Sequence, residues 1–485
     1  MNTRLPLRSR WIALLMALWM APGIPHARAA GSDRPNVVII LADDMGYGDV
    51  GFNGCKDIAT PNIDSLAAHG VRFANGYVSQ PLCSPSRAGL MTGRYEEQFG
   101  HENNPAYLPN DDKIGLPLDQ VTLAQVMRDA GYATGAVGKW HLGAAPCFWP
   151  NARGFTEYFG FLGGGHVYMP YKKGDPLYQE YVKHALKNSL FGEYLRPVMR
   201  NDKPVGFNEY MTDALANEAE SFITRHKSEP FFLYLAFNAV HSPLEAPDKY
   251  VSRFPDIADK RRRTYAGMTS AMDDGIGRVL KTLRDNRLED KTLIWFMSDN
   301  GGPVYTEMPT HNAPLRGYKH QVYEGGIHVP FVAQWRGHLP EGTVYEQPSI
   351  SLDIFPTVAA VTAAKVPEKV KLDGVNLLPY VTGKISTPPH DALYWRNRSA
   401  GYQWAVRQGD YKLLDVGNTV QLYDLKDDLP EAKDLAASMP DVVARLQKLH
   451  DAWNAKLIEP LWPMPKPTKE VFLGSIEFTD MEAGE

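Results

Sequence analysis

Cysteine is scarce in this sequence, with only Cys55, Cys83 and Cys147 among 485 residues. An odd number of thiols cannot pair completely within one chain, so a fully disulfide-bonded chain is excluded and at least one cysteine has no internal partner. If Cys83 is engaged in chemistry, Cys55 and Cys147 either form one disulfide or remain two buried free thiols. The sequence leaves both arrangements open.

Long hydrophobic runs are also lacking near the N-terminus, where a membrane anchor would be expected. The apolar run from Trp11 to Met20 has ten residues, well short of the ~20 that span a bilayer. Three arginines precede this run and Ala27-Arg28-Ala29 follows it, an order typical of a secretory signal peptide. We predict that residues 1–30 are removed on export and that the protein is periplasmic or secreted, or lysosomal in a eukaryote. An uncleaved anchor is the alternative.

A surplus of positive charge is the third feature that the sequence lacks. Removal of residues 1–30 would take away four arginines and leave 47 basic residues against 56 acidic ones, a formal charge of −9. Such a chain is a poor match for a polyanion, so nucleic acid is not expected as a partner.

The composition is that of a globular protein, with 44% hydrophobic and 22% charged residues, and the length favours a large unit with a smaller second domain. Short continuous apolar runs, typical of buried parallel strands, alternate with helical patterns. The predicted strands are Val37–Leu41, Ala133–Val137, Phe231–Phe237 and Leu293–Met297, and the predicted helices span 60–70, 122–131 and 265–283. We therefore predict an α/β fold with an open, mostly parallel sheet covered by helices on both faces.

From about Pro388 the pattern changes to alternating strands separated by turns. These strands are predicted over Leu393–Trp395, Gln403–Val406, Tyr411–Leu414 and Val420–Leu425, and a helix is predicted over Met439–Leu457. The predicted organisation is thus a signal peptide (1–30), a main domain (31–387) and a C-terminal subdomain (388–485) of antiparallel sheet plus helix.

Polar residues follow each of the four predicted parallel strands. They are Asp43 and Asp44, then Lys139 and His141, then Asn238 and His241, and finally Asp299 and Asn300. Any one of them is more often a helix cap or a turn residue than a functional group. Because open α/β sheets bind ligands at the carboxyl ends of their strands, the coincidence at four strands predicts a site at that edge.

The donor set favours a hard cation. Asp43, Asp44, Asp299 and Asn300 offer carboxylate and amide oxygens, which suit Ca²⁺ or Mg²⁺ better than zinc. The usual Cys-x-x-Cys and His-Glu-x-x-His zinc patterns are absent. Cationic side chains such as Arg87, Lys139 and Lys319 could hold a tetrahedral anion against the metal, so the residues alone indicate a metal-dependent hydrolase of an anionic ester.

A specific motif narrows this interpretation. Cys83-Ser84-Pro85-Ser86-Arg87, followed by 88–94 Ala-Gly-Leu-Met-Thr-Gly-Arg, resembles the formylglycine signature of the sulfatases. The resemblance extends over nearly the whole chain beyond residue 30. It also includes Arg34-Pro35-Asn36, Gly138-Lys139-Trp140-His141-Leu142-Gly143, His241-Ser242-Pro243, Ser298-Asp299-Asn300-Gly301-Gly302, Leu315-Arg316-Gly317-Tyr318-Lys319 and Glu324-Gly325-Gly326. It implies an alkaline-phosphatase-like core with a small C-terminal domain.

The resemblance also implies a mechanism and residue roles. A separate formylglycine-generating enzyme would oxidise Cys83 to an aldehyde, 3-oxoalanine, whose hydrate attacks sulfur. Asp43, Asp44, Asp299, Asn300 and the residue made from Cys83 would bind one Ca²⁺, or Mg²⁺. Arg87 would steady the hydrate, Lys139 and Lys319 would bind sulfate oxygens, His241 would protonate the leaving oxygen and His141 would act as the base of the elimination step.

The substrate expected from the resemblance is an organic sulfate ester, such as a sulfated saccharide. A phosphodiesterase or phosphonate monoester hydrolase of the same superfamily is the alternative enzyme, and an inactive carbohydrate-binding relative is a remote alternative. The sequence does not predict the oligomeric state, the position of the sulfate or the choice between Ca²⁺ and Mg²⁺.

For several further residues a functional interpretation competes with a structural one. His101, which follows the nucleophile segment, could touch the substrate or belong to a polar loop. Residues 163–206 resemble a long loop region whose tyrosines, Tyr168, Tyr171, Tyr178 and Tyr181, either stack on sugar rings or pack locally. The basic run 260–263 is predicted to be the solvated start of a helix, and His320 is interpreted as a neighbour of the site.

Overall fold

The computed structural model describes residue 1 and residues 34–171, 175–176, 179, 193–304 and 308–464. Apart from Met1, the predicted signal peptide lies outside the described residues. Among the helices of the described ranges, none combines the length and the apolar character needed to cross a bilayer.

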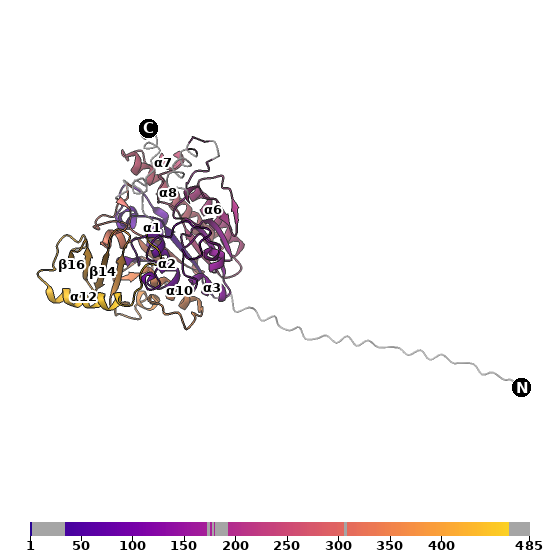
Figure 1. Ribbon diagram of the computed structural model, residues 1–485. Coiled ribbons are helices and arrows are strands. Elements are labelled where there is room, and N and C mark those ends of the chain that lie inside the picture. Colours follow the sequence, from indigo (N-terminus) through magenta and orange to yellow (C-terminus); the bar gives the residue numbers. More distant parts are fainter. Residues whose placement is uncertain (2–33, 172–174, 177–178, 180–192, 305–307, 465–485) are drawn as a thin grey trace.

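A sheet forms the centre of the molecule (Figure 1). It has ten strands in the order β11-β2-β10-β9-β1-β8-β4-β5-β6-β7. Its strands are β1 Asn36–Ala42, β2 Val71–Phe73, β4 Ala133–Lys139, β5 Glu157–Phe161, β6 Val198–Arg200, β7 Lys203–Val205, β8 Phe231–Ala236, β9 Thr292–Ser298, β10 Phe331–Gln334 and β11 Thr343–Tyr345. The central strands β9, β1, β8, β4 and β5 run parallel to one another, which confirms the predicted mostly parallel sheet.

Helices cover both faces of this sheet, and strand β1 shows the reason. Val37, Ile39 and Leu41 belong to the apolar core on one face, whereas Val38 and Ile40 belong to the core on the other. A strand buried on both sides needs this continuous apolar run, and the helices supply the two covers. The first face packs against α2 Cys83–Thr92, α3 Leu123–Asp129 and α10 Ile354–Thr362, and the second against α1 Pro61–Ala68, α6 Met211–Arg225 and α8 Lys260–Asp285 (Figure 1).

The edges of the sheet differ from the predicted pattern. β10 pairs antiparallel with β9, and β6 and β7 form a short antiparallel pair beyond β5. This pair lies within residues 163–206, so part of the segment interpreted as a loop region extends the sheet. Besides several 3-10 helices, the other short elements of the described residues are β3 Gly76–Tyr77, β12 Ser349–Ile350, α7 Asp248–Val251, α9 Glu324–Ile327 and α11 Leu378–Val381.

The C-terminal region forms a four-stranded antiparallel sheet with one helix, as predicted. Its elements are β13 Leu393–Asn397, β14 Gln403–Gln408, β15 Tyr411–Val416, β16 Val420–Asp424 and α12 Pro440–Asn454. Trp395 and Leu414 face the core of the main domain, whereas Trp404 and Leu413 pack against α12. The small sheet is therefore sandwiched between its helix and the main domain (Figure 1).

The three cysteines remain free thiols. Of the two arrangements left open by the sequence, the structure thus has the unpaired one. Cys55 and Cys147 are both half-buried, and Cys55 Sγ lies 3.3 Å from Asp57 Oδ1.

The basic run at the start of α8 is not uniformly solvated, so that prediction was wrong for Arg262. Its guanidinium is buried and contacts Asp49 Oδ1 at 2.6 Å and Asp57 Oδ2 at 2.8 Å. Asp49 is completely buried and also accepts a hydrogen bond from the Tyr265 hydroxyl at 2.7 Å. A helical pattern cannot reveal this pair, because the acidic partners lie more than 200 positions earlier in the chain.

We expect Arg262→Ala to lower the free energy of unfolding by about 3–5 kcal/mol, because Asp49 would be left as an uncompensated buried charge. Urea denaturation followed by circular dichroism measures the change. Lys260→Ala, at an exposed position of the same helix, is the matched control and should change stability by less than about 0.5 kcal/mol. Equal stability of the two variants would contradict the structural role of the Arg262–Asp49 pair.

Candidate active site

Most of the polar residues predicted to share one sheet edge do meet there; Asn238 does not join them. β1 and β9 pair in register up to Ala42 and Ser298, so the residues that follow each strand emerge side by side. Backbone hydrogen bonds join Asp299 N to Ala42 O (3.1 Å) and Asp43 N to Ala239 O (3.0 Å). Parallel neighbouring strands therefore deliver three chain segments to one point, and this part of the sequence prediction is confirmed.

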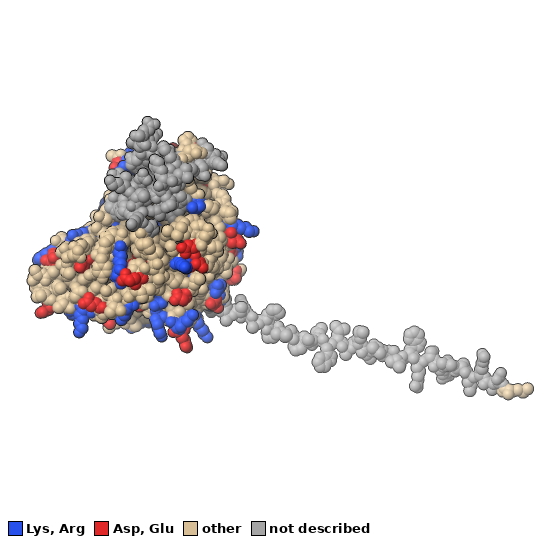
Figure 2. Space-filling view, viewed as in Figure 1, with Lys and Arg blue, Asp and Glu red and all other residues tan. Residues whose placement is uncertain are grey.

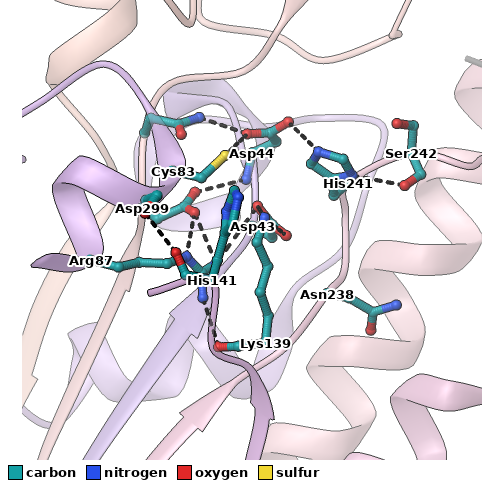
Figure 3. Close-up of polar contacts among 12 residues, drawn as sticks. Asp43, Asp44, Cys83, Arg87, Lys139, His141, Asn238, His241, Ser242 and Asp299 are labelled. Carbon is teal, nitrogen blue, oxygen red and sulfur yellow. Dashed lines mark hydrogen bonds and ion pairs between the residues drawn. The ribbon is translucent and has the colours of Figure 1, made fainter. Parts of the chain in front are cut away.

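Three carboxylates form the centre of the site (Figure 3). Asp43, Asp44 and Asp299 each contribute an oxygen within 4.8 Å of the others, and all three are at most 2% exposed. Asp44 has a left-handed backbone (φ 63°), and its amide donates to Asp299 Oδ1 at 3.1 Å. Three buried carboxylates this close together repel one another strongly when they are ionised. The cluster therefore requires positively charged partners.

Each carboxylate has a cationic side chain as a partner. Lys139 Nζ lies 2.7 Å from Asp43, Lys319 Nζ 2.7 Å from Asp44, and Arg87 Nη2 2.8 Å from Asp299. Burial disfavours ionisation of Asp44, but Lys319 and His241 outweigh it and hold the pKa of that carboxyl well below its usual range. For Asp43 burial prevails and raises the pKa to about 7, although Lys139 opposes the shift.

The position of Lys139 depends on the glycine before it. Gly138 has φ +105°, and a Cβ built there would lie 1.8 Å from the Ala236 carbonyl oxygen. Only glycine permits so close an approach of β4 to β8 at this point. Lys139 follows this glycine as the last residue of β4, and its side chain reaches Asp43.

The donor set fits a hard divalent cation. Asn300 Nδ2 donates to Asp44 Oδ1 at 2.7 Å, whereas Asn300 Oδ1 is buried and accepts no hydrogen bond within the described ranges. A buried amide oxygen without a donor beside three carboxylates is the arrangement that a cation would satisfy. Asp43, Asp44, Asp299 and Asn300 could therefore hold one.

Cys83 is the first residue of α2 and lies against this cluster. Its Sγ is 3.0 Å from Lys319 Nζ and 3.8 Å from Asp44 Oδ1, and the residue is 1% exposed. Burial raises the pKa of the thiol to about 12. The unmodified thiol is therefore protonated at neutral pH and is a weak nucleophile.

Two histidines border the cluster. His241 Nδ1 lies 2.7 Å from the Ser242 carbonyl oxygen, and its Nε2 faces Asp44 Oδ2 at 3.6 Å (Figure 3). His141 is buried with a left-handed backbone (φ 59°). Burial lowers the pKa of His241 to about 3 and that of His141 well below its usual range. Asp44 opposes the shift at His241, and a bound anion would act in the same direction, so His241 could carry a proton beside a bound ester.

Two predicted participants lie outside this group. His101 is completely buried, with Nε2 2.7 Å from Ser84 Oγ and its ring edge-on to Trp462. Asn238 begins the turn after β8, with its carbonyl oxygen accepting from His241 N at 2.9 Å, but its side chain lies apart from the cluster in Figure 3. His101 is thus placed behind the nucleophile segment, next to the residue that follows Cys83.

The sequence analysis assigned no role to Ser298 and left two roles open for Tyr168, and both residues hold the site together. Ser298 Oγ accepts from Met45 N (2.9 Å) and donates to Asn300 O (2.8 Å), which joins the turns after β1 and β9. The Tyr168 hydroxyl donates to the His241 carbonyl oxygen at 2.7 Å. Tyr168 is fully buried, so it packs locally and does not offer a stacking surface. The role of Ser298 could have been suspected from the sequence, because this serine directly precedes Asp299 and Asn300 in the Ser-Asp-Asn motif.

The other tyrosines of residues 163–206 were also predicted either to stack on sugar rings or to pack locally. The Tyr171 hydroxyl donates to Glu245 Oε1 at 2.9 Å, which also indicates a local structural contact. Tyr178 and Tyr181 lie outside the described residues.

The sequence is similar to protein families of known function. A family model described as Sulfatase matches residues 35–364, and one described as N-sulphoglucosamine sulphohydrolase, C-terminal, matches residues 317–456. Mouse arylsulfatase J is 32% identical over 91% of this chain and 79% of its own length. Human N-acetylgalactosamine-6-sulfatase is 36% identical over 76% of this chain and 70% of its own length.

A solved structure extends the likeness to the fold. The crystal structure of Ps i-CgsB in complex with k-i-k-neocarrahexaose has a TM-score of 0.83 and 39% sequence identity, and covers 93% of this chain and 100% of that one. The observed core and C-terminal sheet are those of the alkaline-phosphatase-like sulfatases, as expected. With a family model over more than half of its length, the chain belongs to the sulfatase family and is a sulfuric ester hydrolase.

Proposed function

We propose that this enzyme removes sulfate from a sulfated saccharide, using a nucleophile made from Cys83 and one divalent cation. The observation that carries the proposal is the contact of Cys83 Sγ with Lys319 Nζ (3.0 Å) at the edge of the buried carboxylate cluster. The carboxylates of Asp43, Asp44 and Asp299 are balanced by Arg87, Lys139 and Lys319. A divalent cation would add a surplus of positive charge, which attracts an anionic ester.

Asp43, Asp44, Asp299, Asn300 and the residue formed from Cys83 would hold the cation, for which calcium suits the oxygen donors and magnesium is the alternative. When bound, such a cation polarises the nucleophile and a sulfate oxygen. Arg87 keeps Asp299 oriented through two contacts, Nε at 3.0 Å and Nη2 at 2.8 Å. These contacts support a role for Arg87 in fixing the carboxylate, and the same side chain would also steady the hydrate.

Conversion of Cys83 to an aldehyde by a separate formylglycine-generating enzyme would supply the nucleophile. The hydrated aldehyde offers one hydroxyl for attack on sulfur and a second whose deprotonation expels sulfate. The surroundings of Cys83 suit such a group, because Lys319 Nζ and Asp44 Oδ1 lie within 3.8 Å and can donate and accept hydrogen bonds.

The remaining polar side chains take positioning and proton-transfer roles in this proposal. Lys139 and Lys319 enter the cluster from β4 and from the loop before α9, so each can bind a sulfate oxygen next to the carboxylate that it contacts. His241 Nε2 points into the site and would protonate the leaving oxygen, while His141 would accept the proton in the elimination step. Export through residues 1–30, to the periplasm or outside the cell, belongs to the same proposal.

A saccharide is proposed as the substrate because two relatives point to sugars. One is named N-acetylgalactosamine-6-sulfatase and the other, Ps i-CgsB, was crystallised with k-i-k-neocarrahexaose. These two carbohydrates define the first probes for activity.

Residue 83 is expected to carry an aldehyde in enzyme produced together with a formylglycine-generating enzyme. Peptide mass spectrometry of the residue-83 peptide measures the modification. Cys83→Ala should lower kcat by roughly 10⁴-fold or more because the nucleophile is lost, while thermal unfolding stays nearly unchanged. Cys147→Ala, at a half-buried free thiol, is the matched control and should remain active. Full activity with an unmodified thiol at residue 83 would refute the proposed nucleophile.

One hard cation should be bound per chain. Elemental analysis is expected to find about one calcium or magnesium, and chelation should abolish turnover. Asp299→Asn removes one charged ligand and should lower kcat by about 100- to 1,000-fold, whereas Asp274→Asn, on the surface of α8, should not. Two zinc ions at full occupancy would contradict the single-cation site.

Sulfate esters should be preferred over phosphorus esters. We expect kcat/KM for an aryl sulfate to exceed that for the matching phosphate monoester or phosphonate by at least ~100-fold, or ~2.7 kcal/mol of transition-state stabilisation. Steady-state assays with 4-nitrophenyl esters of each acid measure the ratio. A reversed ratio would support the phosphodiesterase or phosphonate hydrolase alternative, and saccharide binding without turnover by protein modified at residue 83 would support an inactive relative.

A further inference from the structure

A groove lies between the loop that carries Lys319 and the C-terminal sheet. It has a volume of about 580 Å³ and is lined by residues that include Tyr318, His320, Gln321, Tyr402, Gln403 and Asn418. Its volume falls within the ~300–1,000 Å³ typical of ligand sites. We propose that this groove binds a sugar ring next to the sulfated one in an oligosaccharide substrate. The proposal rests on the sulfatase function proposed above.

The groove is directly connected to the reactive centre through the chain. Lys319 stands between the groove residues Tyr318 and His320, and its Nζ is 3.0 Å from Cys83 Sγ. The His320 amide donates to the Pro81 carbonyl oxygen at 2.8 Å, two residues before Cys83. Consecutive Cα atoms are only about 3.8 Å apart, so the groove residues on either side of Lys319 lie within one side-chain length of the reactive centre, a distance that the neighbouring sugar of a bound saccharide can span.

Hydrogen bonds fix the groove walls to each other. The His320 carbonyl oxygen accepts from Asn397 Nδ2, at 2.6 Å, and from Gln403 Nε2, at 3.2 Å. On the same side, His320 Nδ1 lies 2.7 Å from Ser399 Oγ. The loop and the small sheet thus form one preformed surface, which reduces the entropy lost when a ligand binds.

The chemistry of the lining suits a carbohydrate ring. Tyr402 is 43% exposed, and the Arg398 guanidinium lies 5.4 Å above its ring. With Arg398 over one face, the exposed area of the ring is available for stacking against the apolar face of a sugar. Gln321 and Asn418 each bring an amide, which can donate to and accept from sugar hydroxyls.

The charge of the lining also fits a sulfated chain. Among the residues that the structure describes, the ten that line the groove include no Asp or Glu, although the protein has more acidic than basic residues. On the face shown in Figure 2, the basic and acidic side chains of the described residues are interspersed without a continuous basic surface. Recognition of a sulfated oligosaccharide would then depend on local contacts such as this groove and not on a broad electrostatic surface.

The test compares a small substrate with a long one. 4-Nitrophenyl sulfate needs only the sulfate pocket, whereas k-i-k-neocarrahexaose, or an oligosaccharide carrying N-acetylgalactosamine 6-sulfate, would also occupy the groove. Using the better oligosaccharide, Tyr402→Ala should lower kcat/KM about 5- to 50-fold, mainly through KM, and leave the aryl sulfate within about 2-fold. Tyr402→Phe should retain most of the activity because it keeps the ring. Val344→Ala, at an exposed position of the distant edge strand β11, is the control.

The outcomes separate the groove from the proposed function. If the wild-type enzyme hydrolyses the aryl sulfate but neither oligosaccharide, or if Tyr402→Ala affects both substrate types equally, the groove proposal is overturned and the sulfatase function stands. If modified wild-type protein hydrolyses none of these esters, the proposed function itself fails. A selective loss on the oligosaccharide that Asn418→Ala reproduces at about 3- to 10-fold supports the groove.

Discussion

The concentration of negative charge at the end of the central sheet is the constraint on which the rest of the structure depends. Asp43, Asp44 and Asp299 are buried with oxygens within 4.8 Å of one another, an arrangement that a protein interior tolerates only with close positive partners. The partners come from three separate elements: Arg87 from α2, Lys139 from β4 and Lys319 from the loop before α9. The fold therefore brings together acidic and basic side chains that are far apart in the sequence.

A second buried charge network joins the C-terminal subdomain to this arrangement. Lys412 on β15 contacts Glu324 Oε1 at 2.8 Å and Glu431 Oε1 at 2.9 Å, and all three side chains are completely buried. Glu324 begins α9, five residues after Lys319. The small sheet is thereby joined to the segment that carries Lys319, so the C-terminal subdomain can shape the groove that is proposed to bind the substrate.

The sequence predicted the parts of the structure that depend on local pattern. The strands that became β1, β4, β8 and β9 were recognisable because continuous apolar runs reflect burial on both faces, and their positions led to the polar residues at the carboxyl edge. Short strands such as β10, with four residues, carry too little pattern to be recognised. Pairing between distant residues, as for Arg262 with Asp49, leaves no periodic signal at all, because only tertiary packing brings the two together.

The burial of Cys83 at the start of α2 has a consequence for the order of events in the life of the protein. At 1% exposure, the side chain is inaccessible to another macromolecule once the fold is complete. If residue 83 is oxidised by a separate enzyme as proposed, that enzyme must reach the chain while it is still unfolded. The contacts that enclose Cys83 include Lys319, 236 positions later, so residue 83 is synthesised long before the segments that bury it. Rapid folding would therefore compete with maturation, and the yield of active enzyme would depend on the relative rates of the two processes.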